Sequence, residues 1–199
     1  MRKILLFVWA CMGLVCLMSA CKTSVKSKEW KLVWVEDFDQ KNSFDESVWT
    51  KIPRGTSDWN NYMSYYDSCY AMQDGNLILR GIANHTQKND TAPYLTGGVY
   101  TKGKKLFTGG RVEVCARLQA AKGAWPAIWM LPEKAEWPKG GEIDIMERLN
   151  HDRIAYQTTH SYYTHILGIK DNPPHGGINK INPEEYNIYS VDIYPDSLV

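Results

Sequence analysis

Residues 140–147, Gly-Gly-Glu-Ile-Asp-Ile-Met-Glu, constrain the fold more than any other part of the chain. Side chains of a β-strand alternate between two faces, so Glu142 and Asp144 share one face and the isoleucines point to the other. Strict alternation would place Glu147 on the apolar face, but a β-bulge at Ile145-Met146 returns it to the acidic one. A helix would not bring these three positions onto one stripe. The segment therefore predicts a bulged strand with three carboxylates on one face.

Short apolar and aromatic runs broken by turn residues continue from Trp30 to the end of the chain. There is no convincing amphipathic helix and no internal repeat, so the pattern predicts one all-β domain, a jelly-roll β-sandwich. Asp74-Gly75 is a typical hairpin turn. The longest irregular stretches, Pro53–Asn60 and Gly168–Pro183, are expected to be binding loops or disordered. The runs expected to form strands are Lys31–Val35, Tyr62–Tyr66, Asn76–Leu79, Gly98–Thr101, Arg111–Leu118 and Tyr189–Tyr194.

The first twenty residues are typical of a targeting segment, with a basic start and an apolar run, Ile4–Leu17, too short to span a bilayer comfortably. The following Met18-Ser19-Ala20-Cys21 resembles a bacterial lipoprotein cleavage box. This resemblance implies cleavage before Cys21, lipidation of its thiol and an exported lipoprotein anchored to a membrane of the cell envelope. An ordinary secretory signal cleaved near Ala20 is the alternative. Residues 21–29 would then form a polar tether and residues 30–199 the folded domain.

The formal net charge of the whole chain is +1. Residues 1–20 hold two basic residues and no acid, so their removal changes the charge to −1. A near-neutral chain lacks the basic surface that nucleic acid binding requires. Of the five cysteines, Cys69 and Cys115 would remain as thiols, and they could pair or stay as two buried free thiols. No cysteine or histidine spacing suggests zinc, so we expect no metal site.

Three tryptophans, Trp125, Trp129 and Trp137, lie shortly before the acidic segment. Flat indole rings pack on the faces of sugars, and a pair of carboxylates is what cleavage of a glycosidic bond requires. Two other interpretations are open. The acids could belong to an exposed edge strand that they keep soluble, and the rings could pack in the core. We expect at least one of the rings to be core and at least one to stack on sugar.

Glu142–Glu147 resembles the signature of glycoside hydrolase family 16, in the bulged form of laminarinase-like β-glucanases. Further runs resemble other strands of that family in the same order: 32–38, 97–101, 109–114 and the Trp-Pro-Ala-Ile-Trp segment. The resemblance implies a concanavalin A-like jelly roll and a retaining mechanism. Glu142 would be the nucleophile, Glu147 the general acid and base, and Asp144 would tune both. Their mutual repulsion would keep Glu147 protonated, and the two glutamate carboxyls would lie about 5–5.5 Å apart.

The same resemblance points to three further residues that could contact substrate: Asn60, Glu113 and His160. Each has a plainer interpretation. Asn60 is also suited to a turn, Glu113 to a solvated strand and His160 to a structural hydrogen bond. The family commonly has an arginine where this chain has Cys115, which puts one substrate contact in doubt.

The resemblance implies an endo-acting β-glucanase that cuts β-1,3 or mixed β-1,3/1,4 linkages as a monomer. A marine galactan as substrate, transglycosylation, or a surface lipoprotein that binds glycan without hydrolysis are the alternatives. Several strands follow in the family where this sequence ends, and they often supply a structural calcium ligand. We expect no cofactor here, and we expect the 199-residue chain alone to be weakly active or inactive.

Overall fold

The computed structural model describes residues 30–40, 42–119 and 121–199. Contacts divide the chain into two units, Met1–Lys31 and Leu32–Val199, and everything below concerns the second. The predicted signal peptide and the whole of the predicted tether, including Cys21, lie outside the described residues. Within the described ranges, no helix is both long and apolar enough to cross a membrane.

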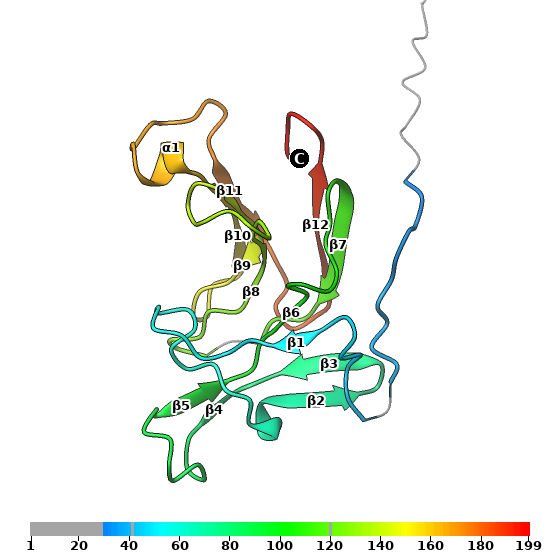
Figure 1. The fold of residues 1–199 in the computed structure, drawn as a ribbon, viewed down its shortest axis with the longest axis vertical. Coiled ribbons are helices and arrows are strands. Elements are labelled where there is room, and N and C mark those ends of the chain that lie inside the picture. Colours follow the sequence, from blue (N-terminus) through cyan, green and yellow to red (C-terminus); the bar gives the residue numbers. More distant parts are fainter. Residues whose placement is uncertain (1–29, 41, 120) are drawn as a thin grey trace, which may run out of the picture. The chain divides into compact units, whose positions relative to one another are not determined.

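Strands form nearly all of the regular structure, as the sequence predicts (Figure 1). In the described part of the chain, two short helical segments interrupt them, η1 (Asp67–Cys69) and α1 (Tyr162–His165). The strands are β1 (Thr50–Lys51), β2 (Tyr70–Gln73), β3 (Asn76–Leu79), β4 (Gly81–Ala83), β5 (Tyr94–Thr96), β6 (Val99–Tyr100), β7 (Gly110–Ala116), β8 (Ala127–Met130), β9 (Glu142–Glu147), β10 (Ile154–His160), β11 (Gly176–Lys180) and β12 (Asn187–Ile193).

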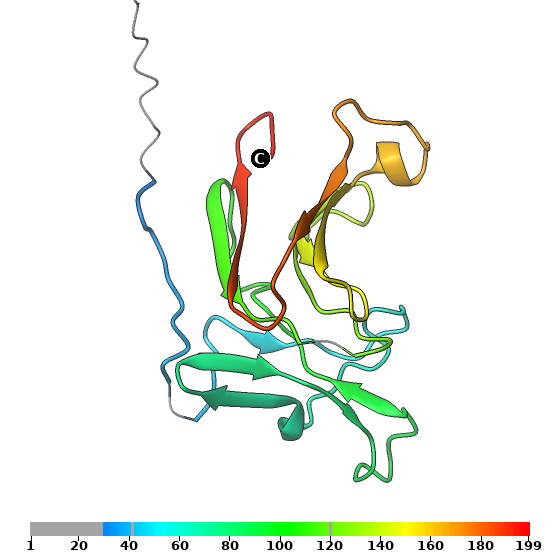
Figure 2. The same ribbon diagram turned by 180° about the vertical axis from the view of Figure 1, so that it is seen from behind.

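Two antiparallel sheets enclose the core (Figures 1 and 2). One has the order β11-β10-β9-β8, and the other pairs β12 with β7 along their whole length. Their inner side chains form one apolar cluster that includes Ile145 and Met146 of β9 and Val191 of β12. Met146 has no exposed surface at all. The apolar side of β9 is thus buried against the second sheet, and its other side is left for the carboxylates.

Three smaller two-stranded ladders are formed by other described strands: β2-β3, β4-β5 and β1-β6. The hairpin between β2 and β3 turns at Asp74-Gly75, with φ of +53° and +70°. Both residues lie in the left-handed region that a two-residue hairpin turn of this type requires. The predicted hairpin is confirmed.

The predicted bulge at Ile145-Met146 is confirmed by the strand register. On β10, Tyr156 lies opposite Glu147 and Thr158 lies opposite Asp144, so two residues of β9 face the single residue Gln157. The Gln157 side chain donates a hydrogen bond of 3.1 Å to the carbonyl of Ile145. This bond satisfies an acceptor of the bulge, so the register shift does not leave it unpaired in the sheet.

Several predicted boundaries are wrong. Lys31–Val35 forms no strand, although Trp34 turns inward and packs on Trp49 at 6.4 Å between ring centroids. The alternation is present, but no described strand pairs with this segment, and a strand needs a hydrogen-bonded neighbour. Tyr62–Tyr66 contributes a single bridge instead of a strand. The expected loop Gly168–Pro183 contains β11. This strand begins with two glycines, which have a low propensity for strands, so the sequence did not predict it.

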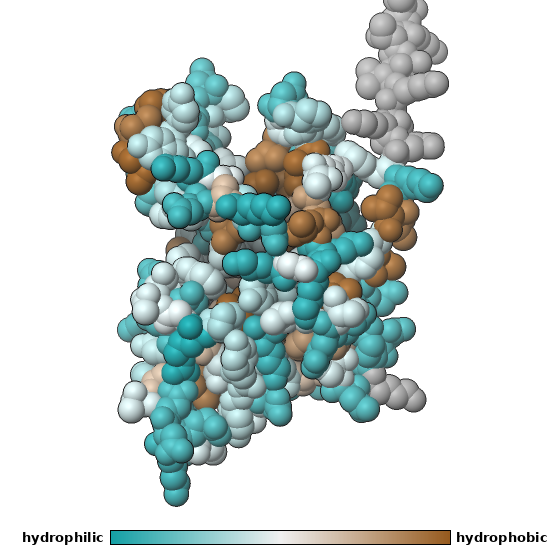
Figure 3. All heavy atoms as spheres, viewed as in Figure 1, coloured by the Kyte–Doolittle hydropathy of each residue, from teal (hydrophilic) through white to brown (hydrophobic). Residues whose placement is uncertain are grey.

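The two thiols are free, and they differ in exposure. Of the two alternatives, the disulfide is not formed, and the pair of buried thiols is met only by Cys69, because Cys115 is exposed on β7. Another exposed feature is an apolar patch just after α1, visible as brown atoms in Figure 3. Its members are Ile166, Leu167 and Ile169.

Candidate active site

The acidic face of β9 is built by its strand register. In an antiparallel ladder, residues directly opposite each other point to the same face. Asp144 is opposite Trp129 of β8 and Thr158 of β10, and Glu142 is opposite His160. The alternating apolar partners, Ile128 against Met146 and Met130 against Ile143, lie on the core side. The three carboxylates therefore share one face with Trp129 and His160, as predicted.

A tryptophan donates its indole N–H to the glutamate at each end of the row. Trp125 Nε1 lies 2.7 Å from Glu147 Oε1, and Trp137 Nε1 lies 2.6 Å from Glu142 Oε2. Both rings are 46% exposed. Each ring therefore orients a carboxylate with its edge and keeps much of its surface available to a ligand.

The double glycine before β9 allows Trp137 to reach Glu142. A Cβ on Gly140 would lie 2.4 Å from Pro132 Cγ and 2.5 Å from Ala135 Cβ, so this close approach excludes a side chain. Gly141 has φ of +80°, in the region that glycine adopts most readily. The turn folds the preceding loop back toward the start of β9, with Gly140 and Gly141 donating to the carbonyls of Glu136 and Pro138.

Asp144, in the middle of the row, is 5% exposed. Burial, the neighbouring Glu147 and Glu142 carboxylates, and a hydrogen bond shared with Glu142 raise the pKa of Asp144 to about 7. Desolvation is the largest cause, because a buried carboxylate loses the water that stabilises its charge. Asp144 thus keeps its proton in a large share of the molecules near neutral pH, and this protonated form can donate a hydrogen bond to Glu142. From the sequence we expected a raised proton affinity on Glu147; the structure shows a raised pKa on Asp144.

Histidines close one end of the site. His160 Nε2 lies 3.2 Å from Asp144 Oδ2, so His160 faces the acids as predicted. His165, which the sequence did not single out, stacks edge-on against Trp137 with ring centroids 4.4 Å apart. The short helix α1 carries it there, because Ser161, directly after β10, caps the helix through a reciprocal pair of hydrogen bonds with Thr164. The Ser-x-x-Thr spacing after His160 was the available signal.

Two of the other predicted residues do not join the acidic row. The Asn60 side chain accepts a hydrogen bond from Ser57 N at 3.1 Å, which is the turn role considered as the alternative. Glu113 is exposed on β7, opposite Ser190 of β12, in the sheet that packs on the apolar side of β9. It cannot reach the acids from there.

Trp129 is the least exposed of the three tryptophans and packs on Trp59 at 4.9 Å between ring centroids.

Metal ligation has no support in the described ranges, where no group of three or more histidine, cysteine or acidic residues is arranged to hold an ion. The three carboxylates of β9 form a row along a strand, and two of them are held by indole donors. This arrangement favours proton transfer and nucleophilic attack.

Comparison with known proteins gives matches over most of the chain. Residues 67–180, more than half of the 199, match the family model described as the XgeA-like catalytic GH16 domain. A keratan-sulfate endo-1,4-β-galactosidase of Sphingobacterium multivorum is 37% identical over 88% of this chain. A β-glucanase of Rhodothermus marinus is 30% identical over 92% of it. The chain spans 42% of the length of the first relative and 66% of the second.

Solved structures show the same fold. The laminarinase catalytic domain of Thermotoga maritima superimposes with a TM-score of 0.72 at 28% identity, over 86% of this chain and 73% of its own. The laminarinase of Rhodothermus marinus gives a TM-score of 0.73 at 29% identity, over 85% and 70%. These likenesses confirm the expected jelly roll. The matched catalytic domain includes the whole acidic strand, and the chain belongs to glycoside hydrolase family 16.

Proposed function

We propose that the acidic face of β9 hydrolyses β-glycosidic bonds inside a polysaccharide chain, with retention of anomeric configuration. The observation that carries this proposal is the bulge at Ile145-Met146, which brings Glu147 onto the same face as Glu142 and Asp144. Without it, Glu147 would point into the core, and the site would lack one of the two carboxyl groups that glycoside hydrolysis needs.

In this proposal, Glu142 attacks the anomeric carbon while Glu147 protonates the departing glycosidic oxygen. The bond from the anomeric carbon to that oxygen breaks as the bond to the Glu142 carboxylate forms. Glu147, now ionised, takes a proton from water, and the resulting hydroxide displaces Glu142 and restores both groups. The two inversions give net retention.

Asp144 supports the nucleophile through its proton. Because its pKa is raised to about 7, a large share of the molecules carry this proton at neutral pH, and the protonated form donates a hydrogen bond to Glu142. Together with the indole N–H of Trp137, this donor holds the Glu142 carboxylate in place and stabilises its charge before attack. His160, 3.2 Å from Asp144, fixes the orientation of the other Asp144 oxygen.

The substrate we propose first is a β-1,3 or mixed β-1,3/1,4-glucan. The Rhodothermus marinus relative is named a β-glucanase, and the structural neighbours described above are laminarinases. The 37% identity to a keratan-sulfate endo-β-galactosidase supports a β-galactan as the second candidate. The half-exposed Trp125 and Trp137 rings would stack on sugar residues at the two ends of the acidic row.

Export and anchoring through Cys21 belong to the same proposal, and the leader sequence alone supports them. An anchored enzyme would act on polysaccharide at the cell envelope, where a polymer too large to enter the cell is accessible. Intact-mass measurement of the mature protein tests this: a diacylated N-terminal cysteine is expected, and a mature chain that starts at another residue would contradict it.

Activity on a substrate panel tests the proposed reaction. Purified protein is incubated with laminarin, barley β-glucan and keratan sulfate, and new reducing ends are measured. Because we expect the 199-residue chain alone to be weakly active at most, we expect slow release from at least one substrate, and its loss in Glu142→Gln. Glu133→Gln, which removes one exposed carboxylate from the preceding loop, serves as the matched control and should retain activity. Glucan binding with no release from any substrate would instead indicate a binding protein.

A further inference from the structure

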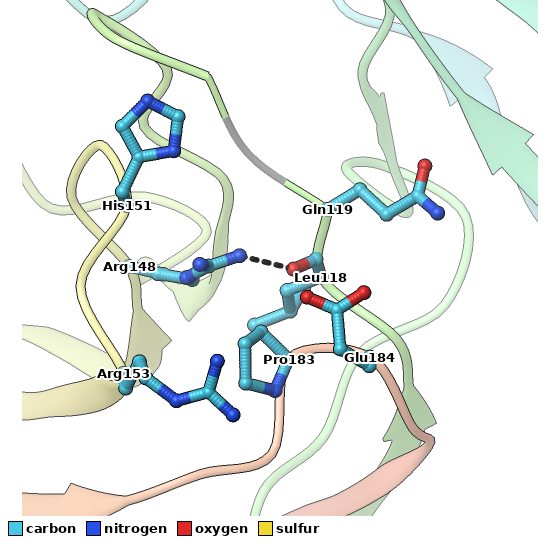
Figure 4. A pocket seen from close by; sticks show the side chains of 7 residues that line it. All are labelled: Leu118, Gln119, Arg148, His151, Arg153, Pro183 and Glu184. Carbon is cyan, nitrogen blue, oxygen red and sulfur yellow. Dashed lines mark hydrogen bonds between the residues drawn. The ribbon is translucent and has the colours of Figure 1, made fainter.

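A second candidate site lies away from the acidic row, in a pocket of about 430 Å³ (Figure 4). Three chain segments form it: the turn between β9 and β10, the residues after β7, and the loop before β12. The lining residues are Leu118, Gln119, Arg148, His151, Arg153, Pro183 and Glu184. Leu118 also belongs to the core on the apolar side of β9, so this pocket opens beside the core and not over the carboxylates.

Arg148 is the unusual member of this set, because it is only 4% exposed. Its Nε donates to the carbonyl of Asp152 at 2.6 Å, and its Nη1 donates to the carbonyl of Leu118, the bond drawn in Figure 4. Both acceptors are neutral. Within the described ranges, no ion pair involves Arg148, so its charge is buried without a carboxylate partner.

A buried and unpaired guanidinium is costly. Buried charges are ordinarily paired, because desolvation costs several kcal/mol that neutral hydrogen bonds repay only in part. The guanidinium has five N–H donors, and the two recorded bonds account for two of them. An anion in the adjoining pocket would supply both the missing charge and further acceptors.

The rest of the lining has the same character. Arg153 follows on the same turn, and Figure 4 shows its side chain directed toward Pro183 and Glu184. None of the ion pairs formed by the described part of the chain includes Arg153. His151 and Gln119 also line the pocket, on opposite sides of it, with side chains that point away from the two guanidinium groups in Figure 4. Two arginines against one glutamate leave the site with a net positive charge.

We propose that this pocket binds an oxyanion, a sulfate or phosphate group held between Arg148 and Arg153. Guanidinium groups present paired donors that match the oxygens of such anions. The bound anion would tie the β9–β10 turn to the segment after β7, and so brace the strand that carries Glu147. This inference rests on the pocket alone and is independent of the proposed reaction.

Calorimetric titration with sodium sulfate tests the proposal, with sodium chloride at equal ionic strength as the reference. We expect saturable binding of sulfate by the wild-type protein. Arg153→Gln should weaken it by about tenfold, the effect of one charge-assisted hydrogen bond. Lys88→Gln removes one exposed positive charge in the β4–β5 loop and should leave binding unchanged. His151→Gln should weaken binding less than Arg153→Gln, and His85→Gln not at all.

The origin of the anion is a second arm of the same titration. Galactose 6-sulfate binding more tightly than sulfate, with galactose inactive, would show a sugar-borne group; equal affinities would show an inorganic anion. The proposal is overturned if sulfate and phosphate give no saturable heat. It is also overturned if Arg153→Gln binds sulfate as tightly as wild type does, or if Lys88→Gln weakens binding as much as Arg153→Gln does, because the effect would then be general to positive charge.

Discussion

Replacement of Asp144 by asparagine should stabilise the protein at alkaline pH while it impairs the site. The unfolded chain releases this proton near the ordinary pKa of 3.8, but the folded protein holds it up to about 7. Between these values the folded state binds more protons than the unfolded state, so the free energy of unfolding falls as the pH rises. Asparagine has nearly the shape of the protonated acid and does not ionise. The free energy of unfolding of the variant should therefore not fall in this way as the pH rises.

The magnitude follows from the two pKa values. A change from 3.8 to about 7 corresponds to roughly 4 kcal/mol at 1.36 kcal/mol per pKa unit. Part of this shift comes from the charges of the neighbouring Glu147 and Glu142 carboxylates, so the value for an isolated group is an upper bound. We therefore expect Asp144→Asn to gain between about 2 and about 4 kcal/mol over wild type at pH 8 relative to pH 4.

Urea unfolding followed at several pH values between 4 and 8 measures this difference directly. Asp39→Asn is the control, because Asp39 is exposed and its loss should leave the pH dependence of wild type intact. Parallel stability curves for wild type and Asp144→Asn across this range would refute the reasoning, because Asp144 would then titrate alike in both states. Burial of the Asp144 carboxyl would thus lower the free energy of unfolding at high pH, while it allows this group to hold a proton beside Glu142 in the site.

Three further predictions concern other parts of the unit. Trp137→Phe keeps a ring but loses the 2.6 Å hydrogen bond to Glu142, so kcat should fall about tenfold or more with a smaller change in KM. Met146→Ala opens a cavity at a fully buried position and should lower the free energy of unfolding by about 2–5 kcal/mol, measured in urea. In maleimide labelling followed by peptide mass spectrometry, Cys115 should react in the folded protein and Cys69 only after unfolding.

The charge pattern of β9 was enough to predict its bulge. In a strand with one buried face, regular alternation would bury the Glu147 carboxylate among isoleucines, and one extra residue removes this cost. The Asp74-Gly75 hairpin followed from equally local chemistry. Both features depend on residues that are neighbours in the sequence, and the structure confirms both predictions.

Predictions that depend on distant partners were less successful. Lys31–Val35 has the alternation of a strand, but alternation does not supply a neighbouring strand. Glu113 lies on a well-predicted strand, yet sequence pattern does not show which of two sheets a strand joins. The role of His165 depends on one turn of helix that folds back on Trp137, which is a tertiary contact. The raised pKa of Asp144 arises from burial, which the linear pattern does not quantify.

The anomeric configuration of the first product tests the central claim most directly. Proton NMR spectra recorded within minutes of adding enzyme to laminarin, or to whichever substrate of the panel is cleaved, distinguish the two new anomers before mutarotation mixes them. Retention through Glu142 and Glu147 predicts that the β-anomer appears first and the α-anomer later. Initial formation of the α-anomer would contradict the assignment of Glu142 as nucleophile.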